Sequence, residues 1–147
     1  MEQNPKASEG EPSAVPASAT SEFKSVDGFT RIISAIRYSR QGLAHAVRHE
    51  AAFRQELMAC SVLVPLAIWL PLPLVEKLLL LGSMALVLIT EIINSAIEAV
   101  VDRVSLDRHP LAGRAKDLGS AAVMIAVVWC AVVWLSLAGP VLWHWRG

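Results

Sequence analysis

The chain has 147 residues, enough for one small domain, and 54% of them are hydrophobic, with a mean hydropathy of +0.49. This apolar content is too high for a soluble protein of this size, so the composition predicts a membrane protein. The 13 basic and 13 acidic residues cancel, which argues against a nucleic-acid partner and makes the position of each charge the informative feature.

The N-terminal part of the chain changes character near residue 28. Residues 1–27 are rich in Ser, Ala, Pro and Glu and contain no apolar core of the kind that a signal peptide needs. We therefore expect a disordered tail. In the next segment, at about residues 29–48, the spacing of the apolar residues predicts a helix that lies on the membrane surface. Its apolar face is formed by Phe29, Ile32, Ile33, Ile36, Leu43 and Val47.

Three apolar segments come next, at about residues 51–70, 74–102 and 111–145. At 1.5 Å per residue each is long enough to cross a hydrocarbon core of about 30 Å. Pro71 and Pro73 mark the turn between the first two segments. The sequence thus predicts an all-α membrane domain over residues 28–147, with three transmembrane helices and one surface helix.

Charged and aromatic residues predict how this domain is oriented. Arginine and lysine gather on the side that holds the tail and the loop after the second span, whereas the other side has Lys77 and Arg146. We therefore expect a cytoplasmic N-terminus and a C-terminus on the opposite side of the membrane. Trp143 and Trp145 would anchor the last span at that far interface.

The second span carries an acidic stripe in the run EIINSAIEAVVDR, residues 91–103. At about 100° per helical residue its polar side chains share one face. They are Glu91, Asn94, Ser95, Glu98 and Asp102. Glu91 lies about 26 Å along the helix from Leu74, near the cytoplasmic boundary rather than the midplane. Ionisable groups in an apolar span are rare and usually functional, although Asp102 could equally be a solvated helix end.

Two further polar runs, HEAAFRQE and GRAKDLGS, begin the first and third spans at the same depth. Glu50 would join Glu91 and Glu98 there, and clustered carboxylates favour a hard divalent ion such as Mg²⁺. Lys116 adds a donor for a phosphate, although neighbouring Asp117 could be only an acid favoured at a helix start. No GxxxxGK[ST] phosphate loop is present. These parts predict phosphoryl transfer to a membrane-dissolved alcohol.

The runs EIINSAIEAVVDR and GRAKDLGSAAV, with GFTRI and EAAFRQE before them, resemble the small prokaryotic integral-membrane diacylglycerol kinases. The resemblance covers about residues 28–147. It implies a homotrimer in the bacterial inner membrane, with three transmembrane helices and one surface helix per chain and with the C-terminus periplasmic. The implied reaction transfers the γ-phosphate of Mg·ATP to sn-1,2-diacylglycerol, giving phosphatidic acid and ADP.

The resemblance also implies roles for single residues. Glu91 matches the general base, Asn94 a polar group of the catalytic site, and Ser120 a group of the substrate site. Glu50 and Glu98 match ligands of the metal that accompanies the nucleotide. Further nucleotide contacts are implied at Arg31, Tyr38, His109, Lys116 and Asp117. The stretch implied to contact the lipid substrate is Ala52, Phe53, Arg54, Gln55 and Glu56.

Other functions remain open from the sequence. A related branch of the family phosphorylates undecaprenol, although EAAFRQE and GRAKDLGS look more like the diacylglycerol branch. A small ion or proton translocating subunit would also place carboxylates in spans, but it should have one near the midplane. A non-catalytic assembly subunit would need neither the lysine nor the carboxylate cluster.

Overall fold

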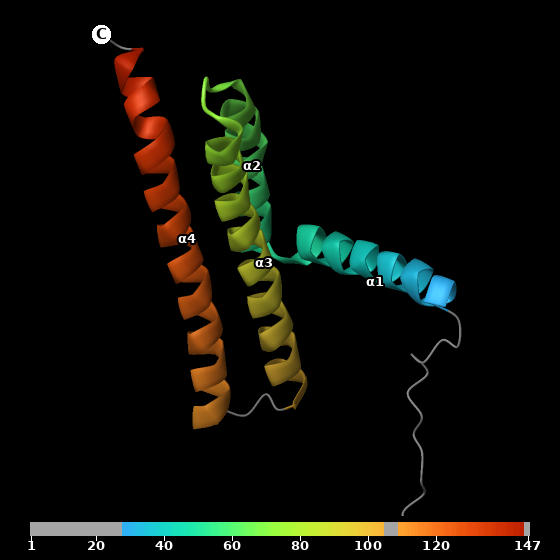
Figure 1. Ribbon diagram of the computed structural model, residues 1–147. Coiled ribbons are helices and arrows are strands. Elements are labelled where there is room, and N and C mark those ends of the chain that lie inside the picture. Colours follow the sequence, from blue (N-terminus) through green and yellow to red (C-terminus); the bar gives the residue numbers. More distant parts are fainter. Residues whose placement is uncertain (1–27, 105–108, 146–147) are drawn as a thin grey trace, which may run out of the picture. The chain divides into compact units, whose positions relative to one another are not determined.

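The computed structural model describes residues 28–104 and 109–145, and every regular element within these ranges is a helix. The helices are α1 (Gly28–His49), α2 (Ala51–Trp69), α3 (Leu74–Val104) and α4 (Pro110–His144), labelled in Figure 1. This confirms the predicted all-α fold, with one amphipathic helix followed by three apolar ones. The tail predicted for residues 1–27 lies outside the described residues.

The chain divides into two units, Met1–Tyr38 and Ser39–Gly147. The described part of the first unit is the beginning of α1, where Phe29, Ile32 and Ile36 are exposed. An exposed apolar face on a helix that is otherwise polar is typical of a segment that lies in a membrane interface. The second unit contains the rest of α1 and the three apolar helices.

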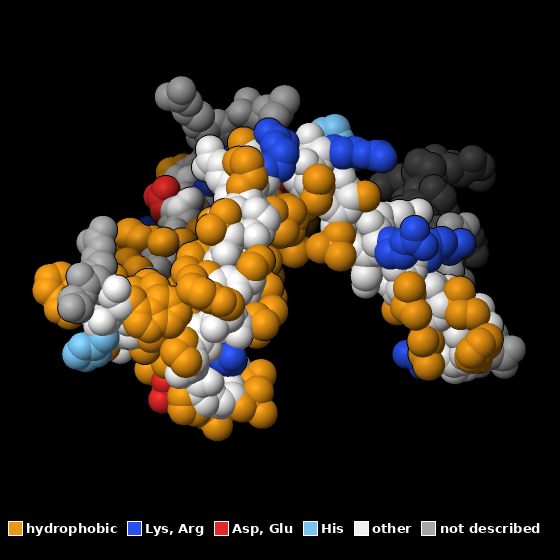
Figure 2. Space-filling model, turned by 90° about the horizontal axis from the view of Figure 1, so that it is seen from above, with side chains coloured by type: hydrophobic (Ala, Val, Ile, Leu, Met, Phe, Trp, Pro, Cys, Tyr) orange, Lys and Arg blue, Asp and Glu red, His pale blue; other side chains and the backbone are white. Residues whose placement is uncertain are grey.

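The helices α2, α3 and α4 are each long and apolar enough to cross a membrane. Their 19, 31 and 35 residues correspond to about 29, 47 and 53 Å of helix, against a hydrocarbon core of about 30 Å. Large apolar side chains remain exposed on all three helices, among them Val62, Ile93 and Leu135. Figure 2 shows such side chains over much of the visible surface. An apolar exterior of this extent suits lipid rather than water.

The three apolar helices pack in chain order, α2 against α3 and α3 against α4 (Figure 1). A buried apolar cluster lies near the turn between α2 and α3. It includes Ala67 of α2, Leu70 directly after this helix, Leu80 of α3, and Val133 and Ala138 of α4. The packed apolar core therefore lies at this end of the domain, and the polar residues of α3 lie at the opposite end of that helix.

Polar and aromatic contacts tie the same end together. α2 ends before Pro71 and Pro73, because a residue that precedes proline favours an extended backbone, and Leu70 adopts one with ψ of 138°. The Lys77 ammonium then donates to the free carbonyl of Ile68 at 2.6 Å. Trp69 and Trp145 meet edge to face with ring centroids 4.7 Å apart, a placement typical of a membrane interface.

Candidate active site

The acidic stripe of α3 faces a cavity of about 410 Å³. The start of α2 and the N-terminal third of α4 form its other walls. Glu91 and Asn94 are almost completely buried, with 6% and 9% of their surface exposed. The cavity is lined by Glu50, Ala51, Ala52, Glu91, Asn94, Ser95, Glu98, Ser120 and Val123. Three segments far apart in the sequence therefore meet at one polar cavity.

Three carboxylates, those of Glu50, Glu91 and Glu98, line this cavity. A partly buried carboxylate is costly unless a cation or a hydrogen-bond donor compensates for the lost water. Within residues 28–104 and 109–145, no three His, Cys, Asp or Glu side chains lie close enough together to hold a metal ion by themselves. Mg²⁺ does not need such a cage, because it commonly takes one or two protein carboxylates together with substrate phosphates and water. Glu50 and Glu98 fit that mode of binding.

Asn94 organises the buried side of the cavity. Its amide nitrogen donates to Glu98 Oε1 at 3.1 Å, one helical turn further along α3. Its Oδ1 is buried and has no hydrogen-bond partner among the described residues. Asn94 thus orients the Glu98 carboxylate through its amide nitrogen.

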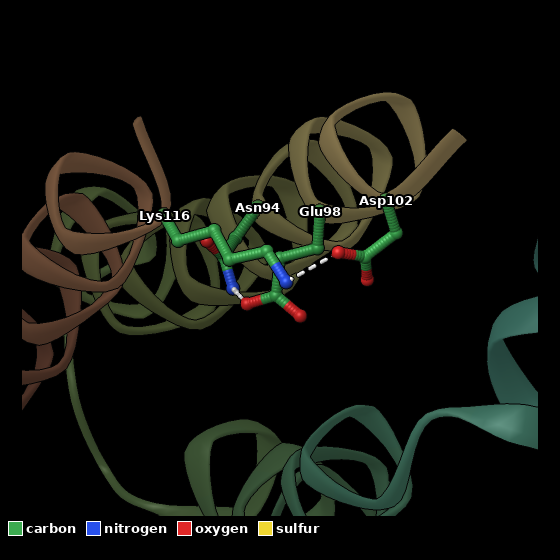
Figure 3. Close-up of polar contacts among 4 residues, drawn as sticks. All are labelled: Asn94, Glu98, Asp102 and Lys116. Atoms are coloured by element: carbon green, nitrogen blue, oxygen red, sulfur yellow. Dashed lines mark hydrogen bonds and ion pairs between the residues drawn. The ribbon is translucent and has the colours of Figure 1, made fainter. Parts of the chain in front are cut away.

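Lys116 and Asp102 connect α4 to the end of α3 just beyond this cavity. Lys116 Nζ lies 2.6 Å from Asp102 Oδ1, and Figure 3 shows the pair beside Asn94 and Glu98. The side chains are 38% and 53% exposed, so the ion pair is open to solvent and contributes little to stability. The lysine ammonium is therefore close to the cavity and held by a partner that a phosphate could replace.

The residues of the stretch 52–56, predicted to contact lipid, lie in different surroundings because they follow the turn of α2. Ala52 lines the polar cavity, whereas Phe53 is buried, with 3% exposed. Arg54 and Gln55 are exposed, and Arg54 Nη1 donates to the carbonyl of Arg48 at 3.2 Å. Only Ala52 of these four therefore reaches the carboxylates.

Glu56 lines a second, mainly apolar cavity of about 330 Å³ between α2, α3 and α4. Its Oε2 and the indole nitrogen of Trp134 are buried without a hydrogen-bond partner in the described part of the chain. Cys60 and Cys130, the two free cysteines, line the same cavity. Glu56 thus lines a different cavity from Glu91.

The predicted nucleotide contacts lie at several places. Arg31 and Tyr38 are on the first part of α1, where Arg37 Nη2 donates to the Tyr38 hydroxyl at 3.5 Å. His109 precedes α4 and caps it, because its Nδ1 accepts from the Leu111 backbone N–H at 3.2 Å. Asp117 is exposed on α4. Lys116, by contrast, contacts the acidic stripe through Asp102.

Two features of the site were not predicted from the sequence. The pairing of Asp102 with Lys116 joins residues on different helices, and helical periodicity alone does not show which residues face each other. Gly119 is buried against the Asn94 side chain. A glycine three residues after a lysine in GRAKDLGS was the available signal, since glycine in a helix often marks a close approach.

Comparison with known proteins adds an independent finding. Residues 37–138 match the family described as prokaryotic diacylglycerol kinase. That range includes the whole of the polar cavity together with Lys116 and Asp102.

Individual relatives agree with this match. The chain is 53% identical over 112 residues to a diacylglycerol kinase of Escherichia coli, covering 73% of this chain and 92% of the relative. It is 47% identical over 117 residues to a diacylglycerol kinase of Pseudomonas aeruginosa, covering 80% and 95%. With the Haemophilus influenzae protein of the same description it shares 45% identity over 107 residues, covering 73% and 91%.

Proposed function

Because this chain belongs to the prokaryotic diacylglycerol kinase family, we propose that it transfers the γ-phosphate of ATP to the hydroxyl of sn-1,2-diacylglycerol. The products are phosphatidic acid and ADP. Family membership confirms the resemblance that the motifs indicated and makes the chain a kinase rather than an ion translocator or an assembly subunit. Together with three apolar helices, it also makes the chain a multi-pass membrane protein.

Three carboxylates in one cavity, within a chain of this family, carry the proposal for where the reaction occurs. Glu91 is the proposed general base. It takes the proton of the lipid hydroxyl as that oxygen forms a bond to the γ-phosphorus and the bond from this phosphorus to the bridging oxygen breaks. The electron pair of the broken bond leaves with ADP.

The proposed roles of the neighbouring residues follow from their chemistry. Glu50 and Glu98 hold Mg²⁺ together with the phosphates, and Asn94 keeps Glu98 in position. The metal supplies positive charge that offsets the charge developing on the transferred group. Lys116 exchanges its Asp102 partner for a phosphate oxygen. Further nucleotide contacts are proposed for Arg31, Tyr38, His109 and Asp117.

The lipid substrate is proposed to approach along α2 and α4. Ser120 and Ala52 line the cavity that contains Glu91, so they are proposed to contact the glycerol end of the substrate. Phe53, Arg54, Gln55 and Glu56 belong to the proposed lipid-contacting stretch. A diacylglycerol hydroxyl lies at the membrane boundary, which is where the length of α3 puts Glu91 if Leu74 marks the other boundary.

The proposed setting is the bacterial inner membrane, with the N-terminus cytoplasmic and the C-terminus periplasmic. Basic residues near the cavity end of the helices support this orientation. A homotrimer is also proposed. Gly82, Ala85, Ala96 and Ala99 form an exposed stripe of small residues on α3, which would let copies of this helix approach closely in lipid. A monomeric mass in active preparations would contradict the trimer.

The test of the proposed function is a lipid-phosphorylation assay on protein embedded in bilayers. We expect ATP consumption only when Mg²⁺ and diacylglycerol are both present, with phosphatidic acid formed in equal amount. Undecaprenol in place of diacylglycerol is the matched acceptor control. Phosphorylation of undecaprenol with none of diacylglycerol would assign the chain a different lipid, and ATP consumption without either alcohol would contradict a lipid kinase.

A further inference from the structure

Gly119 of α4 has an environment unlike that of the other described glycines. Five other described glycines have open space around them, because a Cβ atom would meet no heavy atom within 4 Å except the neighbouring backbone of its own helix. They are Gly28, Gly42, Gly82, Gly113 and Gly139. A Cβ atom at Gly119 would collide with Oδ1 of Asn94 and lie 3.3 Å from its Cγ. The Asn94 amide therefore occupies the space that a side chain at residue 119 would need.

The collision concerns the amide and not the spacing of the helices. The same Cβ atom would lie 3.8 Å from the Cα atom of Asn94, which is an ordinary van der Waals contact. The backbones of α3 and α4 could therefore keep their separation if residue 119 were alanine, and only the Asn94 side chain would have to turn. A glycine required simply for close helix packing would show its short contacts to backbone atoms instead.

Turning the Asn94 amide would change the polar cavity. Asn94 is 9% exposed, and the space into which its side chain could turn is that of the cavities it borders. Its Nδ2 is the donor to Glu98 Oε1 at 3.1 Å, and a rotated amide would lose that bond. The Glu98 carboxylate, which lines the same cavity as Glu91, would then be free to move.

We propose that Gly119 is a positioning residue: its lack of a side chain fixes the Asn94 amide, which in turn fixes the Glu98 carboxylate. Gly119 does not touch the proposed metal or substrate. This inference rests on the proposed function, because it assigns Gly119 a role through residues of that site.

The test is a double-mutant cycle of Gly119→Ala and Asn94→Ala in the full chain reconstituted in bilayers. Gly113→Ala is the matched control, since it lies on the same helix and a Cβ atom there meets nothing. Three quantities are measured for each variant: kcat with radiolabelled ATP, the Mg²⁺ concentration that gives half-maximal rate, and Tm. The last does not depend on catalysis.

Gly119→Ala alone should lower kcat by about 10²-fold, as expected for misplaced groups in an active site, and should raise the Mg²⁺ requirement and lower Tm. In the Asn94→Ala background the same change should have almost no further effect on any of the three quantities, because the colliding amide is gone. Gly113→Ala should behave as the parent does.

Equal losses in both backgrounds would overturn the inference, since alanine would then be colliding with something other than Asn94. Coupling in Tm with unchanged kcat and Mg²⁺ requirement would also overturn it, because the contact would be structural only. A parent protein that does not phosphorylate diacylglycerol is a different failure: it refutes the proposed function, and the catalytic role of Gly119 with it, whatever the Tm cycle shows.

Discussion

The ion pair between Lys116 and Asp102 leads to a prediction about the KM for ATP. The direction in which KM changes distinguishes two roles for Asp102. If Asp102 only holds Lys116 when no nucleotide is bound, it competes with a phosphate for the ammonium group. The change Asp102→Asn keeps the size of the side chain and removes this competitor. The KM for ATP should therefore fall or stay constant, whereas Lys116→Met should raise it.

The exposure of the two side chains limits the magnitude. With Lys116 38% and Asp102 53% exposed, the pair belongs to the class of surface ion pairs whose contribution is small. Complete loss of the competition would thus lower KM by at most about fivefold. Loss of a hydrogen bond from Lys116 to a charged phosphate should have the larger effect and raise KM by about 10-fold to 100-fold.

Stability should hardly respond to Asp102→Asn. Asp102 lies in the last turn of α3, where the helix dipole disfavours a carboxylate. Losing that unfavourable term offsets part of the lost ion pair, so Tm should stay near that of the parent.

The assay is steady-state phosphorylation of diacylglycerol in bilayers over a range of ATP concentrations, at low and at high salt. Glu76→Gln is the matched control, because it makes the same chemical change in the first turn of α3, at the opposite end of the helix from the cavity. The effect of Asp102→Asn on KM should shrink at high salt, since exposed charges are screened. A rise in KM as large as that of Lys116→Met would refute this reasoning and make Asp102 part of the binding site.

Three further predictions concern the metal, the core and the tail. Glu50→Gln and Glu98→Gln should each raise the Mg²⁺ concentration needed for half-maximal rate, and unchanged magnesium titrations in both variants would remove these residues from metal binding. Leu80→Ala should lower the free energy of unfolding in detergent by about 2 to 5 kcal/mol, because Leu80 is fully buried in the apolar cluster; a loss below about 1 kcal/mol would mean that the helices close around the cavity. Deletion of residues 2–27 should leave activity within about twofold, since this segment lacks apolar periodicity, and loss of most activity would show that the tail contributes to the site.

Much of the fold could be predicted because it depends on local properties of the sequence. Apolar runs longer than a bilayer core are visible directly, and Pro71 and Pro73 mark one of the turns. Periodicity also places Glu91, Asn94 and Glu98 on one face, and the structure brings that face to a cavity. These features require no knowledge of which helix faces which.

Contacts between helices could not be predicted in the same way. Lys116 and Asp102 are 14 positions apart, and which of several nearby acids the lysine would meet depends on how α3 and α4 are rotated. The same rotation decides that Glu56 lines the apolar cavity with Trp134 rather than the polar one. The role proposed for Gly119 depends on the Asn94 side chain that lies against it, and the sequence alone does not show that contact. A pattern in one sequence shows which residues share a helix face, whereas tertiary packing decides which residues of another helix that face contacts.

The base assigned to Glu91 offers the most direct test of the account. The change Glu91→Gln keeps the size of a side chain that is 6% exposed and removes its ability to accept a proton. With saturating diacylglycerol, kcat should fall by about 10² to 10⁴, the usual contribution of a positioned general base. Binding of Mg·ATP and Tm should remain close to those of the parent. Retention of more than about a tenth of the parental kcat would contradict the account and move the base to another residue, with Asp117 the next to be tested.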